Sequence, residues 1–260
     1  MAKNLITESI VLPSASVKLY GNNFDGHLTL RAMTTVEERI RLSGQSFYQT
    51  MTKIVNNCIV DNKNPDGSYK LDSALFTDFD FFAVLVKLRI LSYGAKYRTV
   101  ATCRNCGRQF ITNVDLSTLE YNLVPEDFVE PYTIGPLPSS GDTLGCRFLR
   151  VKDRIDIEKE KDILLAKNPD YVGDPAYELE MQRRIVTVNG EDLDSVAARD
   201  YVENMIAMDS QMYHDNIHKP YGIIRIGFTE CTGCSGLAHW VLSPDGEFFR
   251  SVFDDTQPTV

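Results

Sequence analysis

The chain has 260 residues, a formal net charge of −9 at pH 7, 43% hydrophobic residues and 24% charged residues. This composition is ordinary for a globular protein, and the length suits one large or two modest domains. The acidic balance argues against a nucleic-acid binder, no apolar run is long enough for a membrane span, and we expect no signal peptide.

The N-terminal 31 residues look extended, and His27 to Arg31 alternate as a strand does. This segment is either an arm that lies on a neighbouring protein or an edge strand of its own domain. A helix is predicted to begin at Thr34 or Thr35, where Glu37 or Glu38 completes a capping box. An apolar stripe at helical spacing then continues to Cys58.

A second helix is predicted from about Thr77 to Tyr93, with Gly94 at its C-terminal end. Its middle is apolar on every side, which is typical of a helix buried in a core. Arg89 interrupts this apolar stretch, and we expect it to pair with a carboxylate or to extend its charged end to the solvent. The helix leads directly into a predicted β-hairpin at 97–114.

The middle of the chain, at 122–220, reads as strands followed by helices. Prolines exclude a helix from 121 to about 142, and a strand is predicted at 143–151. Three helices are then predicted: a charged surface helix at about 153–167, one that begins at Pro175 and reaches Val188, and one from about 192 to Tyr213. This block is predicted to be a mainly helical module inserted between two hairpins.

A second hairpin follows at about 223–242, and each hairpin has a Cys-x-x-Cys pair in its turn. Gly107 and Gly236 follow the pairs and can supply the positive φ that a tight turn around a metal needs. Two thiolates cannot complete a tetrahedral zinc site, whereas four can. The sequence therefore predicts one closed zinc site, which is structural because no position remains for water. Its predicted ligands are Cys103, Cys106, Cys231 and Cys234.

Two other interpretations of the cysteine pairs stay open. A redox pair is typically found at the start of a helix, but Arg108 to Val114 reads as a strand. The four cysteines could also be reduced thiols without a ligand. Disulfides need an oxidising compartment, which nothing in the sequence indicates. We expect Cys58 and Cys146 to be buried apolar thiols.

Five cations lie close together around the first pair, and they allow two interpretations. They could form a phosphate-binding patch, which would make the protein a zinc-ribbon module that binds nucleic acid. They could instead balance the charge of a zinc ion held by four thiolates, which we favour. These cations are Arg89, Lys96, Arg98, Arg104 and Arg108.

Two further features have weaker implications. His214 and His218 are four residues apart, but no third ligand completes a hydrolytic metal motif. Trp240, the one tryptophan, is predicted to be a core residue beside the metal rather than an interface anchor.

The join between the buried helix and the first hairpin resembles a known family. The helix ends in Leu88-Arg89-Ile90-Leu91-Ser92-Tyr93-Gly94, and Tyr97 and Cys103-Arg104-Asn105-Cys106-Gly107 follow. The strand then closes on Val114-Asp115-Leu116-Ser117-Thr118-Leu119, and Phe248-Phe249 follow the second hairpin. With the opening Leu12-Pro13-Ser14, Leu30-Arg31 and Glu37-Glu38, this pattern resembles the baseplate hub proteins of contractile-tailed, T-even-like phages over about two thirds of the chain.

The resemblance implies a structural or assembly role in the tail baseplate, with no catalytic residues. It implies other phage tail or baseplate proteins as partners, several copies in a ring, a location in the virion, and assembly in the host cytoplasm. We expect no nucleic acid, membrane or small-molecule substrate as a partner.

The expected fold is α+β, with N-terminal helices and a zinc-ribbon-like unit made from the two hairpins. The expected division is an extended arm at 1–31, a helical region with the first hairpin at 32–121, the inserted module at 122–220, and the second hairpin with a tail at 221–260.

Overall fold

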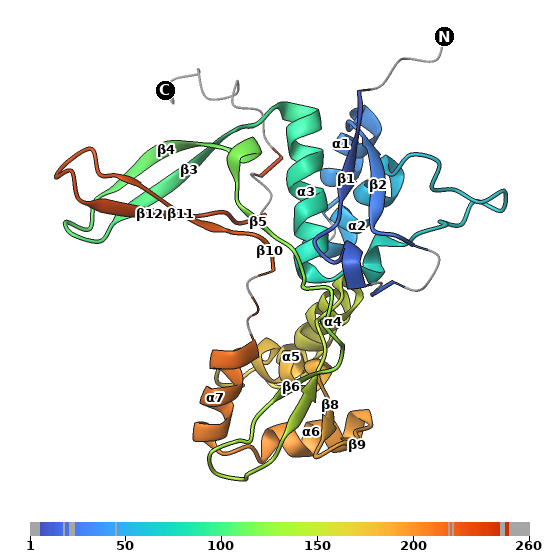
Figure 1. Cartoon of the computed structure of the whole chain (residues 1–260), viewed down its shortest axis with the longest axis vertical. Coiled ribbons are helices and arrows are strands. Elements are labelled where there is room, and N and C mark those ends of the chain that lie inside the picture. The colour runs from blue at the N-terminus through green and yellow to red at the C-terminus, as the bar shows by residue number, and fades with distance from the viewer. Residues whose placement is uncertain are drawn as a thin grey trace. The chain divides into compact units, whose positions relative to one another are not determined.

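The computed structural model describes residues 6–17, 19–20, 24–44, 46–217, 219, 221–244 and 248–249. The fold is α+β, as predicted (Figure 1). The chain divides into two compact units, and the second is largely an insertion in the first. Unit 1 comprises Met1–Asp72, Phe79–Val124 and Tyr221–Val260, and unit 2 comprises Ser73–Asp78 and Pro125–Pro220. None of the helices in the described residues has both the length and the apolar character needed to cross a bilayer.

Unit 1 begins with a β-hairpin. Strand β1 (Thr7–Val11) pairs antiparallel with β2 (His27–Arg31), and a short 3-10 helix, η1 (Ala15–Val17), lies between them. Leu28 and Leu30 alternate with exposed residues along β2 and are buried. The N-terminal segment thus contributes to the core of unit 1, and a role as an arm on a neighbour stays a prediction.

The single helix predicted from residue 34 to Cys58 is wrong, because the chain forms two helices there. Helix α1 (Thr35–Arg41) begins with the predicted capping box between Thr34 and Glu37. Helix α2 (Phe47–Cys58) begins at a new cap, Ser46, whose side chain accepts a hydrogen bond from the Gln49 amide. Gly44, with φ of 71°, separates the two helices, since a left-handed residue cannot continue a helix.

Helix α3 (Asp78–Tyr93) is the buried helix that the sequence predicts, and η2 (Ser73–Leu75) precedes it. Arg89 lies on α3 and is fully buried, so its charged end does not reach the solvent. Its guanidinium donates hydrogen bonds to three backbone carbonyls, at 2.8 Å to Phe248, 2.7 Å to Gly94 and 3.2 Å to Lys96. Arg89 therefore ties the end of α3 to the strand that follows it and to the C-terminal region.

The two hairpins form one four-stranded antiparallel sheet with the order β11-β12-β3-β4. Strand β3 (Lys96–Cys103) pairs with β4 (Gln109–Asp115), and β11 (Ile226–Glu230) pairs with β12 (Leu237–Val241). The hairpins join where β12 pairs with β3 (Figure 1). After the 3-10 helix η3 (Leu116–Thr118), β5 (Tyr121–Asn122) pairs with β10 (Gly222–Ile223) at the two points where the insertion leaves and rejoins unit 1.

Unit 2 contains a second four-stranded sheet with the order β6-β7-β8-β9, and four helices among the residues that the structure describes. Its strands are β6 (Tyr132–Ile134), β7 (Leu144–Cys146), β8 (Ile185–Val188) and β9 (Glu191–Asp192). Its helices are α4 (Val151–Lys167), α5 (Ala176–Arg184), α6 (Ser195–Glu203) and α7 (Ala207–Ile217).

Three sequence predictions for unit 2 are wrong in detail. The strand predicted at 143–151 is only β7, and Val151 already begins α4. The helix predicted to reach Val188 ends at Arg184, because the next residues pair with β7. The last predicted helix is broken into α6 and α7. The division into four segments that the sequence suggests stays a prediction.

Candidate metal centre

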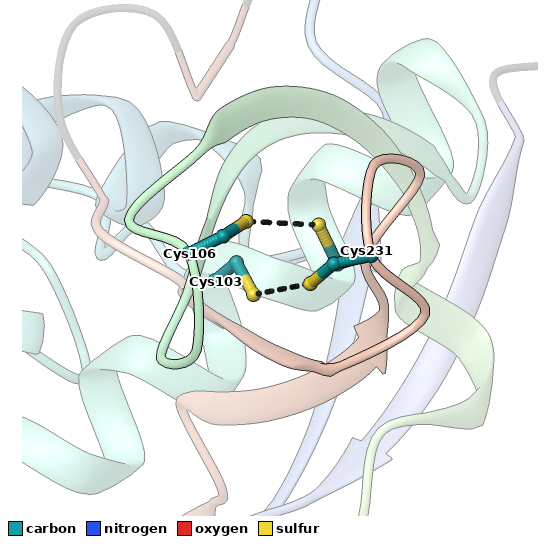
Figure 2. Close-up of side chains that lie close together, drawn as sticks. Cys103, Cys106 and Cys231 are labelled. Atoms are coloured by element: carbon teal, nitrogen blue, oxygen red, sulfur yellow. Dashed lines mark hydrogen bonds between the residues drawn. The ribbon is translucent and has the colours of Figure 1, made fainter.

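The two Cys-x-x-Cys pairs meet at the ends of the two hairpins, as the sequence predicts. The Sγ atoms of Cys103, Cys106, Cys231 and Cys234 all lie within 4.8 Å of one another. The Sγ atoms of Cys103 and Cys234 are 3.7 Å apart, and those of Cys106 and Cys231 are 3.8 Å apart. Figure 2 shows the sulfurs converging on the space between the two turns.

The turn between β3 and β4 is organised around the sulfur of Cys103. The Gly107 amide donates to the Cys103 carbonyl at 3.0 Å, and the Cys103 amide donates to the Arg108 carbonyl at 2.9 Å. The Asn105 amide donates to Cys103 Sγ at 3.4 Å. The backbone of this turn therefore closes around one of the four sulfurs.

The turn between β11 and β12 repeats this arrangement. The Ser235 amide donates to the Cys231 carbonyl at 3.0 Å, and the Cys231 amide donates to the Gly236 carbonyl at 2.8 Å. The Gly233 amide donates to Cys231 Sγ at 3.4 Å. The two turns therefore present their first cysteines with the same backbone geometry.

The residue after each pair adopts a left-handed conformation, which only partly matches the prediction. Gly107 has φ of 70°, as expected, but in the second turn it is Ser235, with φ of 52°, that adopts this conformation. Gly236 is needed for space instead. A Cβ atom there would lie 3.0 Å from the Asn105 Cβ and 3.2 Å from Cys234 Sγ.

Direct contacts also join the two turns. The Arg104 amide donates to the Leu237 carbonyl at 3.1 Å. The Asn105 side chain lies 3.7 Å from Cys234 Sγ. Arg108 packs against Gly233, where a Cβ atom would lie 2.7 Å from its guanidinium. These contacts fix the two turns relative to each other and place the Arg108 guanidinium against the second Cys-x-x-Cys turn.

One cysteine of each pair is buried, and the other is exposed. Cys103 and Cys231 form an apolar cluster with Ala101 and Ala238. Trp240 packs against this cluster, as predicted for a residue beside the metal ligands, although it is only partly buried. It lies directly over Gly227 on the neighbouring strand, where a Cβ atom would be 2.0 Å from the indole.

The pKa values of the thiols are shifted in different directions. The Gly236 amide is the main cause that lowers the pKa of Cys234 to about 7, and the Gly233 amide lowers the pKa of Cys231. The Arg108 amide also lowers the pKa of Cys106, but hydrogen bonds with the neighbouring thiols outweigh this and raise it to about 11. Four adjacent thiolates repel one another, so a cation is needed before all four can ionise.

The donor set and its spacing fit a tetrahedral metal ion. Zinc–sulfur bonds of about 2.3 Å place the sulfurs of a tetrahedron about 3.8 Å apart, close to the two shortest separations here. All four cysteines are free, and these separations are well beyond a disulfide bond. The residues could therefore hold a zinc ion with no position left for water.

The sequence matches a family described as T4 bacteriophage base plate protein over residues 13–215, which is most of the 260-residue chain. The chain belongs to this family. Comparisons with curated proteins and with solved structures returned no match. Membership in the T4 baseplate family implies a location in the tail baseplate and association with other baseplate proteins. The matched region contains the first cysteine pair and ends before the second.

The remaining candidate ligands of this baseplate protein lie elsewhere. Cys58 and Cys146 are buried, and burial raises the pKa of each to about 12. The His214 ring lies tilted against the Tyr177 ring, with ring centroids 4.6 Å apart, and His218 lies outside the described residues. Within the part of the chain that the structure describes, the four clustered cysteines are the one group of three or more potential ligands.

The five cations around the first cysteine pair do not form one patch. Arg89 is buried in the core of unit 1, whereas Arg104 lies over the ring of Phe228, with its Cζ atom 5.4 Å from the ring centroid. Arg108 lies against the second turn. Arg89 is therefore not part of any phosphate-binding surface.

Proposed function

We propose that this baseplate protein is a non-enzymatic structural or assembly subunit of the baseplate hub, and that one zinc ion fixes its two hairpins. The observation that carries the zinc proposal is the convergence of four sulfurs from two turns at tetrahedral spacing. The family match supports the baseplate role. The proposed ligands are Cys103, Cys106, Cys231 and Cys234.

The zinc ion would act as a cross-link between distant parts of the chain. Cys106 and Cys231 are 125 positions apart, and the two hairpins share only a short ladder between β12 and β3. Closing a loop of this length costs about 4–5 kcal/mol in chain entropy. When bound, the ion neutralises two of the four thiolate charges and offsets part of this cost.

A closed four-thiolate site supports a structural role rather than a catalytic one, because no open position remains for a substrate or water. The proposed partners are other baseplate proteins, with several copies of this chain in a ring in the virion. Assembly would take place in the host cytoplasm. No nucleic acid, membrane or small-molecule substrate is needed for this role.

The hub role can be tested in a phage that encodes this chain. Deletion of its gene should give particles without complete baseplates by electron microscopy, and complementation should restore them. Mass spectrometry of purified virions and of isolated hubs shows whether the protein stays in the particle or leaves after assembly. Normal baseplates after deletion contradict both forms of the proposal.

The zinc proposal can be tested by metal analysis of the purified full-length protein. We expect about one zinc per chain, which fits a four-thiolate site. A Cys234→Ser variant should lose the metal. Because Cys234 is exposed, this substitution leaves no cavity in the core. A wild-type protein purified without zinc, and unable to take it up, contradicts the proposal.

A further inference from the structure

The outer face of the hairpin sheet, opposite Trp240, carries exposed aliphatic side chains where a solvated sheet normally carries polar ones. Four of them, one from each strand, are Val100 (53% exposed), Ile111 (59%), Ile226 (52%) and Val241 (52%). We call these four residues the aliphatic row.

The strand register places these residues side by side. Ile226 pairs with Val241, and Val100 pairs with Ile111. The register between β12 and β3 pairs His239 with Thr102 and Trp240 with Ala101. One further step along this register places Val241 opposite Val100. The aliphatic row therefore crosses all four strands without a polar interruption.

The opposite face of the same sheet is already packed by Trp240 and the cluster of Ala101, Cys103, Cys231 and Ala238. The aliphatic row thus adds an apolar band to the second face of a sheet whose first face is already packed, and antiparallel sheets normally leave that second face polar. Contiguous exposed apolar surface often marks a binding site, whereas single scattered apolar residues on a surface do not.

Cations flank the aliphatic row. Arg98 precedes Val100 by two residues on β3, so it projects from the same face. On the other side of the row, Phe228 is 53% exposed and carries the guanidinium of Arg104 over its ring. Asp115 and Glu230 alternate onto the same face farther along their strands, so the positive character is confined to the residues next to the row.

We propose that the aliphatic row is a docking surface for one segment of another baseplate protein, whose apolar side chains are flanked by carboxylates. This inference rests on the proposed function. Charge selects the occupant, because carboxylates beside the bound segment would meet Arg98 and Arg104. A second copy of this chain docked through the same face would instead bring its own Arg98 and Arg104 close to these two arginines, and like charges repel. The branched aliphatic side chains of the row offer no ring on which a nucleic-acid base can stack, and the ring of Phe228 beside them already carries the Arg104 guanidinium.

The first test removes the apolar character and keeps the strands. The double variant Val100→Thr/Ile111→Thr retains β-branched side chains, so the sheet should keep its zinc and its Trp240 emission. Its matched control is Val196→Thr/Ile163→Thr, which makes the same two changes at 56% and 53% exposed positions of unit 2. We expect the row variant to enter baseplates at least tenfold less than the control. Equal incorporation of the two variants overturns the proposal.

The second test identifies the occupant. A photo-cross-linking amino acid at Ile111, on edge strand β4, is activated in infected cells, and the attached peptide is sequenced. We expect a peptide from another baseplate protein, with apolar residues next to Asp or Glu. A synthetic copy of this peptide should bind the purified chain more weakly as salt increases. A cross-link to a second copy of this chain or to nucleic acid overturns the proposal.

The proposed function and the proposed docking surface can be refuted separately. If wild-type protein is absent from baseplates and from their assembly intermediates, the proposed function itself fails. If wild-type protein is present and the row variant enters equally well, only the docking surface fails.

Discussion

Removal of the metal should loosen the sheet that the two hairpins share. Structural zinc sites bind the ion with about 10–16 kcal/mol at neutral pH, and a concentration of about 1 µM corresponds to about 8 kcal/mol. Zinc buffered near 1 µM therefore stabilises the folded chain by about 2–8 kcal/mol. This is a large share of the stability of an ordinary domain, which is about 5–15 kcal/mol.

Trp240 makes this effect measurable, because it is the one tryptophan in the chain and packs against the cluster that contains Cys103 and Cys231. A zinc-selective chelator should shift its emission to longer wavelength and lower the melting temperature by at least about 4 °C. Addition of zinc should reverse both changes. The control is the same chelator saturated with zinc beforehand.

Two results would refute this reasoning. The first is a chelated protein that contains no metal and keeps both its Trp240 emission and its melting temperature. The second is a Cys234→Ser variant that melts at the wild-type temperature in the presence of zinc. Either result would mean that strand pairing and the cluster around Trp240 hold the hairpins without an ion.

Three further predictions follow from single contacts. Ser235→Gly should raise the free energy of unfolding by up to about 1 kcal/mol, because Ser235 has φ of 52° and glycine adopts positive φ without strain. Gly107→Ser should lower the free energy of unfolding by about as much, and denaturant unfolding measures both changes. After chelation, a thiol reagent should modify Cys106 and Cys234, which are exposed, and should reach Cys58 and Cys146 only after unfolding, since both are buried. Modification of Cys58 or Cys146 in the folded protein contradicts this. Burial opposes ionisation of Glu37, but hydrogen bonds from Arg31 and Thr34 outweigh it and lower its pKa from 4.5 to about 2. This pair therefore stabilises the fold above about pH 4.5 and loses its contribution as pH falls through 2. Glu37→Gln should cost about 2–3 kcal/mol at neutral pH and much less at pH 2, and an equal cost at both values would contradict this assignment.

The candidate site was predictable because its signal is local and chemical. Each Cys-x-x-Cys pair specifies a tight turn by itself, and four thiols satisfy a coordination number that two do not. The role of Ser235 was not predictable, because a glycine stands next to it and fits the left-handed position better. Crowding by Asn105 and Cys234 explains the glycine at 236, and this appears only when the two turns meet.

The errors in the fold have a common physical cause. The apolar stripe from Val36 to Cys58 continues across Gly44, so periodicity alone gives no sign of the break. Ile185 and Val188 suit one face of a helix, but pairing with β7 makes their segment a strand. Arg89 is bound by carbonyls that are distant in sequence or exposed by the end of α3. In each case a tertiary contact overrides a local preference.

The pairing of β5 with β10 changes how the long separation of the cysteines should be understood. Asn122 lies opposite Gly222, so the whole insertion between them is already closed into a ring by this ladder. Only β4 with the residues between it and β5, and β11 with the residues between β10 and it, then separate the ladder from the sulfurs. An ion that arrives after the ladder has formed meets two turns that are already neighbours. The size of the insert can therefore vary without making metal capture harder.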